Sequence, residues 1–70
     1  MIEITIFKGC LHIRVSELNV KTKVELLDAC SIKNCTAKMD SYNIIEVRGT
    51  HSNLYNLLVE LTLSYLVLLK

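Results

Sequence analysis

The chain contains no proline and no tryptophan, and its only glycines are Gly9 and Gly49. Without proline-rich or glycine-rich stretches, the 70 residues contain no flexible linker and no low-complexity segment. Charge is sparse and balanced, because eight basic and seven acidic side chains give a formal net charge of +1. This balance gives no reason to expect a polyanionic partner. We see no internal repeat and expect a single domain spanning residues 1–70.

The chain also lacks the features of an exported protein. The opening MIEITIF has no basic segment followed by an apolar one, so it does not resemble a signal peptide. Three cysteines without such a signal (Cys10, Cys30 and Cys35) are typical of reduced thiols in the cytosol. We therefore expect a cytoplasmic protein without disulfides. A chain of this length buries only about 60% of its unfolded surface, and oligomerisation is one way to supplement so small a core.

Apolar residues make up 51% of the chain, and they alternate with polar ones at its start. This alternation predicts two strands, over residues 2–7 and 11–16, joined by a two-residue turn at Lys8-Gly9. Glycine suits the positive φ that such a turn requires. A slip of one residue would turn both apolar sets toward water, so the pattern specifies the register. It places Ile2 opposite Val15, Ile4 opposite Ile13, Ile6 opposite Leu11, and Glu3 opposite Arg14.

The segment over residues 20–30 has two interpretations. A two-residue loop at Leu18-Asn19 would make it a third strand paired with residues 11–15. Its apolar residues also fit helical spacing, with Ser16 as the N-cap. We favour the strand, because the β-branched run VKTKV weakens a helix.

The sequence predicts a further strand over residues 42–48, where Ile44, Ile45 and Val47 supply an apolar core. A turn near Lys33-Asn34 would pair it with the third strand and set Val20 against Val47. Asp40-Ser41 is the place for a bulge or a second turn.

The last segment, residues 50–70, is predicted to be one long helix with Thr50 or Ser52 as its N-cap. At about 100° per residue, its polar side chains form one narrow stripe. A membrane span needs about 20 mostly apolar residues. The run here is shorter and carries Glu60 at its centre, so we do not expect a membrane anchor. The stripe consists of Asn53, Asn56, Glu60 and Ser64.

The apolar arc of this helix is wider than one sheet face can cover. We expect one side to pack on the sheet and the remainder to meet another copy of the chain, because a large exposed apolar patch is unusual on a monomer. The residues predicted for this interface are Leu54, Leu58, Leu61, Tyr65, Leu66, Leu68 and Leu69.

Candidate catalytic and metal sites are weak. Cys10 and His12 share a strand face, and Cys30, Cys35 and His51 could join them only if the fold brought them together. A structural zinc site usually contains a closer cysteine pair than C-x4-C. Asp28 and Asp40, as paired carboxylates, and Cys10 with His12, as nucleophile and base, lack a supporting motif. We expect neither a cofactor, nor a metal, nor an enzyme.

Basic residues on the predicted sheet suggest a partner-binding face. Its candidates are Lys8, His12, Arg14, Lys21 and Lys23, with acidic residues among them. Sheets that bind single-stranded nucleic acid display aromatic side chains for stacking, and Phe7 is the one candidate here. We therefore rank nucleic-acid binding second.

Together these patterns predict an α+β fold in two layers. An antiparallel meander of three to four strands within residues 1–49 would be covered by one long helix over residues 50–70. We expect a small non-enzymatic regulator, adaptor or inhibitor that binds an unidentified protein and dimerises through the helix. Such small chains occur among viral and mobile-element proteins. A nucleic-acid-binding regulator using Arg14, Lys21 and Lys23 is the alternative, and a membrane-associated protein anchored by the tail is the third.

Overall fold

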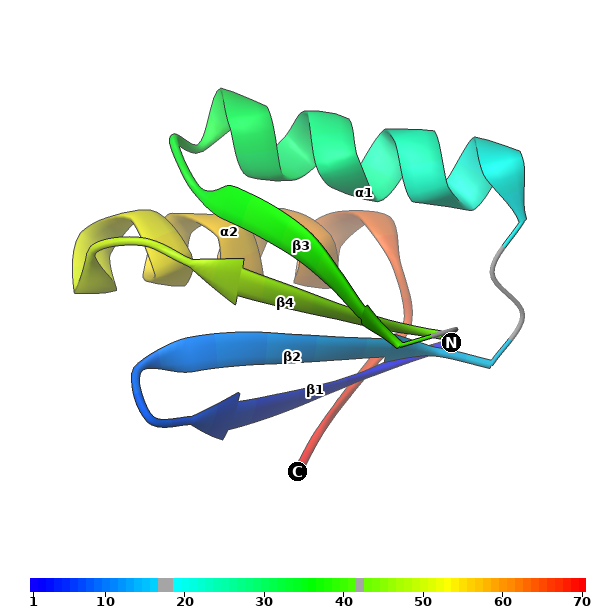
Figure 1. Ribbon diagram of the computed structural model, residues 1–70, viewed down its shortest axis with the longest axis horizontal. Helices are drawn as coiled ribbons and strands as arrows, with labels where there is room; N and C mark the ends of the chain where they lie inside the picture. Colours follow the sequence, from blue (N-terminus) through cyan, green and yellow to red (C-terminus); the bar gives the residue numbers. More distant parts are fainter. Residues whose placement is uncertain (17–18, 42) are drawn as a thin grey trace.

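The computed structural model describes residues 1–16, 19–41 and 43–70. It confirms an α+β fold but contains five strands and two helices (Figure 1). The order strand–strand–helix occurs twice and is followed by a last short strand. The elements are β1 (Ile2–Phe7), β2 (Cys10–Val15), α1 (Val20–Ile32), β3 (Thr36–Ser41), β4 (Ile44–Arg48), α2 (His51–Ser64) and β5 (Val67–Leu69).

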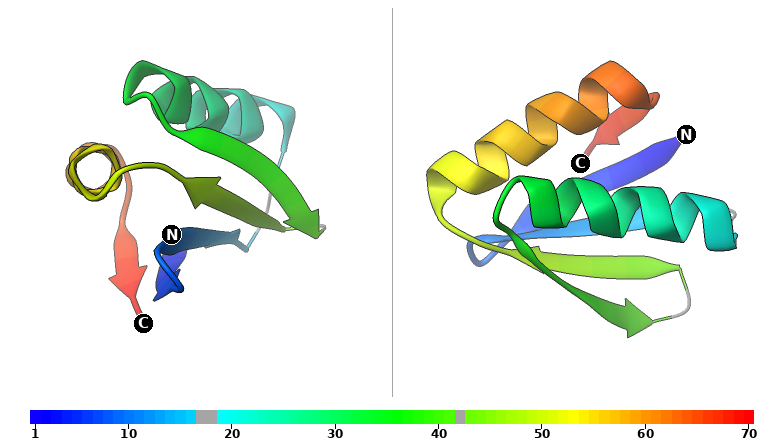
Figure 2. Two further views of the ribbon diagram at one scale, coloured as in Figure 1. Left: turned by 60° about the vertical axis from the view of Figure 1, so that its left-hand side comes forward. Right: turned by 90° about the horizontal axis from the view of Figure 1, so that it is seen from above.

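The five strands form one sheet in the order β3-β4-β2-β1-β5. The predicted meander is therefore wrong, because β2 pairs with β4 and not with the segment that follows it. All neighbours are antiparallel except β5, which runs parallel to β1. Both helices lie on one side of the sheet, as Figure 2 shows, and no described helix or strand covers the opposite side. We call the uncovered side the open face.

The β1–β2 hairpin has the predicted register, including Ile2 opposite Val15 and Ile4 opposite Ile13. Its turn residues Lys8 and Gly9 have φ values of 52° and 74°. Two positive φ values are what a type I′ turn requires. The alternating pattern therefore specified both the pairing and the turn.

The segment after β2 is a helix, so the preferred third strand is wrong. Asn19 caps α1, because its side-chain oxygen accepts a hydrogen bond from the N–H of Thr22 at 2.8 Å. Leu26 and Cys30, four residues apart, are the buried residues of this helix. Burial of this stripe outweighs the weak helix propensity of the β-branched residues. The proposed cap Ser16 does not start the helix, and Leu18 of the predicted loop lies outside the described residues.

The second hairpin pairs β3 with β4. The predicted pairing of Val20 with Val47 is therefore wrong. The turn at Lys33-Asn34 ends α1 instead, and Asn34 adopts a φ of 58°. The register shifts between Met39 and Ser41, which confirms an irregularity at the predicted position. Strand β4 lies within the predicted range 42–48, although Tyr42 lies outside the described residues.

The C-terminal helix is shorter than predicted. Thr50 is its N-cap and accepts a hydrogen bond from the N–H of Asn53 at 3.1 Å. It ends at Ser64, and Tyr65 is already extended, with φ −135° and ψ 159°. The last residues then add to the free edge of β1, which supplies hydrogen-bond partners for their backbone. A 14-residue helix and a short strand replace the single helix over residues 50–70.

The core lies between the sheet and the two helices. Ile4, Ile13, Ile45 and Val47 face the helices and are fully buried. From the helices, Leu26, Leu57 and Leu61 complete this layer. Because successive residues of a strand point to opposite sides, the neighbours of these sheet residues must line the open face.

Candidate functional site

Exposed apolar side chains gather on one side of the molecule. The side of α2 that points away from α1 carries Tyr55, Val59 and half-buried Leu58. Near this flank lie Ile6 of β1 and Leu69 of β5, which are both exposed on the side of the sheet that carries the helices. We call this flank of α2, together with Ile6 and residues 66–69, the β5-edge surface; within it Leu68, which lies opposite Glu3, belongs to the other side of the sheet.

The β5-edge surface contains a hollow of about 160 Å³. Aliphatic side chains of Ile6, Leu11, Leu54 and Leu58 line it, together with the ring of Tyr55. A cavity of about 150 Å³ with aliphatic walls is large enough for one benzene ring. The hollow can therefore receive one apolar side chain from another molecule.

Strand β5 also offers backbone groups at its outer edge. β1 donates to the carbonyl of Leu66 and accepts from the N–H of Lys70, each at 2.9 Å. Because backbone groups alternate along a strand, Leu68 also faces β1, and Val67 and Leu69 face away from it. Within the described part of the chain, β5 has no neighbour on that outer side. The N–H and C=O groups of Val67 and Leu69 are therefore open to another strand.

The structure divides the predicted interface residues. Leu54 and Leu61 lie in the core of the single chain, and Leu58 and Tyr65 are half-buried. Leu66, Leu68 and Leu69 are exposed, but they belong to an extended segment rather than to the helix. Ile6 was not among the predicted interface residues. Its alternation with Thr5 correctly indicated the side of the sheet on which it lies, but not that its side chain stays exposed there.

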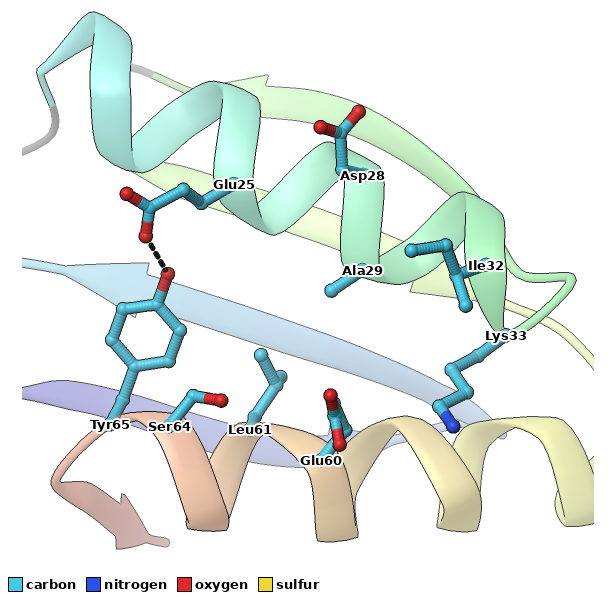
Figure 3. Close-up of a pocket in the computed structure, with 9 residues that line it drawn as sticks. All are labelled: Glu25, Asp28, Ala29, Ile32, Lys33, Glu60, Leu61, Ser64 and Tyr65. Atoms are coloured by element: carbon cyan, nitrogen blue, oxygen red, sulfur yellow. Dashed lines mark hydrogen bonds between the residues drawn. The ribbon is translucent and has the colours of Figure 1, made fainter.

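The two helices enclose a groove of about 330 Å³ on their facing sides (Figure 3). Glu60 and Ser64 from the predicted polar stripe line it from α2. Tyr65 closes one end, because its hydroxyl donates a hydrogen bond to Oε2 of Glu25 at 2.8 Å. Burial, and secondarily this hydrogen bond, raise the pKa of Tyr65 to about 12. The phenol therefore stays protonated near neutral pH and ties the end of α2 to α1.

The groove carries more acidic than basic side chains. Glu25 and Asp28 of α1 and Glu60 of α2 line it, with Lys33 at one end. A phenol with a raised pKa is a hydrogen-bond donor and not a base at neutral pH. Asp40, the predicted partner of Asp28, lies on β3 and does not line the groove. The groove accounts for part of the polar stripe of α2, because Glu60 and Ser64 face the open gap between the helices.

The three cysteines are buried and unpaired. Burial raises the pKa of Cys30 to about 11, and burial also raises the pKa of Cys35. Such thiols stay protonated and are poor nucleophiles and poor metal ligands. Cys10 and His12 do lie on the same face of β2. Among the described residues, no group of three or more His, Cys, Asp or Glu side chains could hold a metal ion.

The predicted partner-binding face is split between the two layers. His12 and Arg14 lie on the open face, and Lys8 lies in the turn beside it. Lys21 and Lys23 belong to α1, in the other layer. Placing all five on one sheet face is therefore wrong, and the reason is the helix that replaced the third strand.

The open face holds more cations than carboxylates. Arg48 donates to Glu46 at 2.6 Å, and Lys70 lies 2.9 Å from Glu3. These hydrogen bonds lower the pKa of both carboxyl groups, and the Glu46 contact raises the pKa of Arg48. Each carboxylate thus has one cation at salt-bridge distance, and a second charge, Arg14 for Glu3 and Lys38 for Glu46, acts on it from the neighbouring strand. Arg14 and Lys38 project from the same face, and among the described residues neither forms a salt bridge.

An aromatic side chain lies at one end of the open face. Phe7 is 55% exposed. Its ring meets that of His12 edge to face, with centroids 6.2 Å apart, and Nζ of Lys8 lies 5.3 Å from its centroid. The face therefore presents a ring and a cation together.

Comparison with known protein families, curated proteins and solved structures finds no match for this chain. Neither α1 nor α2, nor any other helix in the described ranges, has the length and apolar character needed to cross a bilayer. The function is therefore inferred from the geometry of the chain itself.

Proposed function

We propose that this protein is a non-enzymatic binding protein that acts as a homodimer and regulates a protein partner. The observation that supports dimerisation is the β5-edge surface, where an open strand edge and exposed apolar side chains lie together. This proposal moves the predicted interface from the helix alone to the helix flank and the strand that follows it.

A second copy fits this edge by antiparallel pairing of β5 with itself. With Leu68 on the two-fold axis, Val67 of one copy faces Leu69 of the other. Each such pair exchanges two backbone hydrogen bonds, so four hydrogen bonds join the two copies. The edge is self-complementary, as an interface with two-fold symmetry requires. Free N–H and C=O groups on an apolar strand favour this kind of strand addition.

The strand edge by itself is too small to hold a dimer. Stable interfaces bury about 1,200–2,000 Å² in total, which is about 600–1,000 Å² per copy. The chain exposes 4735 Å², so each copy must contribute about an eighth to a fifth of its surface. Three strand residues cannot supply this area, and the apolar flank of α2 lies where the remainder is needed. Burial of that flank supplements the small core.

The mass of the purified chain in solution tests the proposal. We expect twice 8.0 kDa by light scattering or sedimentation. Leu66→Lys and Leu69→Lys place a charge in the interface and should shift the chain to the monomer.

Ile32→Lys is the matched control, because Ile32 is 74% exposed on α1 and Leu66 is 73% exposed beside β5. The same substitution at equal exposure should leave the dimer intact. A monomeric wild-type chain would contradict dimerisation, and equal weakening by Ile32→Lys would place the interface elsewhere.

A further inference from the structure

We infer that the open face binds single-stranded nucleic acid, with Phe7 as a stacking platform and Arg14 and Lys38 as phosphate contacts. The predicted set that included Lys21 and Lys23 cannot act as one surface, because the helix places them in the other layer. The open face of the sheet yields a different set.

Charge complementarity is the first argument. Among the described residues, Glu3 and Glu46 of the open face are each matched by a basic side chain at 2.9 Å or less, and Asp40 is exposed at the bulge of β3. Arg14 lies opposite Glu3 and Lys38 opposite Glu46, but both are exposed and neither forms a salt bridge among the described residues, so each can meet phosphate. Phosphate neutralisation by Lys and Arg supplies most of the affinity of sequence-independent binding. The groove between the helices, where Glu25, Asp28 and Glu60 outnumber Lys33, is less suited to phosphate.

The exposed ring of Phe7 is the second argument, and it separates nucleic acid from an acidic protein. The carboxylates of an acidic protein would need only the cations of this face in order to bind. Bases also need a flat apolar surface, and Phe7 presents an exposed ring with Nζ of Lys8 over one of its two faces. Open sheets that bind single strands combine aromatic side chains with a basic surface. Phe7 is not part of the core, because its side chain points away from the helices.

Dimerisation would extend this face without being required for it. A two-fold axis perpendicular to the sheet leaves both open faces on the same side of one continuous sheet. One strand of nucleic acid could then cross both copies, which would raise its affinity through a second set of contacts. Binding by a monomeric Leu66→Lys variant remains expected, with lower affinity.

Fluorescence anisotropy of a labelled uridine oligonucleotide of about 16 nucleotides tests the inference. We expect binding that weakens steeply between about 0.05 M and 0.2 M salt. The double variant Arg14→Gln, Lys38→Gln should bind more weakly, and its log–log salt slope should fall by about 0.7 for each phosphate that is no longer neutralised. Phe7→Leu keeps the apolar bulk but removes the ring, and should weaken binding by about 5- to 150-fold.

The control is the double variant Lys21→Gln, Lys23→Gln, which removes the same charge from the helix layer. It should bind nearly as well as the wild type, and all variants should retain the wild-type circular dichroism. The inference is overturned if the oligonucleotide does not bind, or if the control loses as much affinity as the open-face variant. It is also overturned if polyglutamate binds as tightly and Phe7→Leu changes neither affinity, because the face would then serve an acidic protein.

Discussion

The two edge strands of the sheet differ in charge and in regularity. Strand β3 carries exposed Lys38 and Asp40, and its register is interrupted between Met39 and Ser41. Strand β5 consists of Val67, Leu68 and Leu69, and its register with β1 is regular. Charges and bulges are the usual means by which an edge strand resists pairing with another chain.

The difference shows which end of the sheet is suited to a partner. The β3 edge has both protective features, whereas the short β5 edge is apolar and lies beside the exposed flank of α2. An unprotected edge beside an apolar flank would promote aggregation if nothing covered it. A defined dimer through β5 removes that hazard.

Proline substitutions at two adjacent positions of β5 test its outer edge and its β1-facing edge individually. Val67→Pro removes an outward N–H at the first residue of the strand, where proline is tolerated. The dimer would lose two hydrogen bonds of about 1 kcal/mol each. We therefore expect its dissociation constant to rise by about 30-fold or more, with the monomer still folded.

Leu68→Pro is the comparison, because its N–H faces β1. This change should detach β5 from the sheet, and it should lower the free energy of unfolding as well as the affinity. Sedimentation and urea unfolding measure the two quantities separately. If Val67→Pro leaves the dimer unchanged, the outer edge of β5 is not the interface.

The β3 edge can be made to resemble β5. Lys38→Val combined with deletion of Asp40 removes the charge and the extra residue of the bulge. We expect species heavier than a dimer, in amounts that grow with protein concentration, because each chain then has two adhesive edges. Thr36 keeps part of this edge polar, so the new contact should be weaker than that at β5. Lys38→Val alone, with the bulge retained, should remain a dimer by light scattering.

The sequence predicted local features well where one signal decided them. The β1–β2 register, the Lys8-Gly9 turn and the Thr50 cap each follow from a few neighbouring residues. The segment over residues 20–30 was mispredicted because β propensity and helical spacing disagreed there. Only burial of Leu26 and Cys30 in the shared core decides between them, and this burial depends on the whole fold.

The end of α2 and the candidate surfaces were harder to predict for a related reason. Nothing in LSYLVLLK marks a helix stop, because neither glycine nor proline occurs there. The strand forms because β1 has a free edge, which only the sheet order reveals. The open face was likewise obscured, because its members come from separate strands. Lys38 and Arg14, for example, are brought onto one face by the β2–β4 pairing.

Tyr65 links the groove to the start of β5, so its removal should loosen that edge selectively. Tyr65→Phe loses the hydrogen bond to Glu25 and should lower stability by about 0.5–1 kcal/mol. Hydrogen exchange should become faster for the amides of β5 and stay unchanged for those of β3. Equal acceleration at both edges would contradict a local role.

The same tyrosine predicts a pH dependence. Its pKa is about 12 in the folded chain, against an ordinary value of 10.0. The folded chain therefore keeps a proton that the unfolded chain releases between these values. The stabilisation is complete below about pH 10 and declines as the pH rises toward 12. The difference in stability between the wild type and Tyr65→Phe, measured by urea unfolding, should shrink over this range.

The smallest effect concerns the ion pair between Glu3 and Lys70, which joins β1 to the end of β5. The hydrogen bond from Lys70 lowers the pKa of Glu3 below its ordinary value of 4.5. This contribution is therefore present above pH 4.5 and lost as the pH falls further. Exposed pairs contribute little, so Glu3→Gln should change the Tm only slightly at neutral pH, and less at high salt.

Glu46→Gln is its matched control, because Glu46 accepts a hydrogen bond from Arg48 of the same strand. Both variants remove one paired carboxylate from the open face, but only Glu3→Gln removes a link between strands. The amide of Leu68 should therefore exchange about two to three times faster in Glu3→Gln and at the wild-type rate in Glu46→Gln. If the Leu68 amide exchanged at the same rate in both variants, the backbone hydrogen bonds alone would hold β5 against β1, and the Glu3–Lys70 ion pair would not contribute.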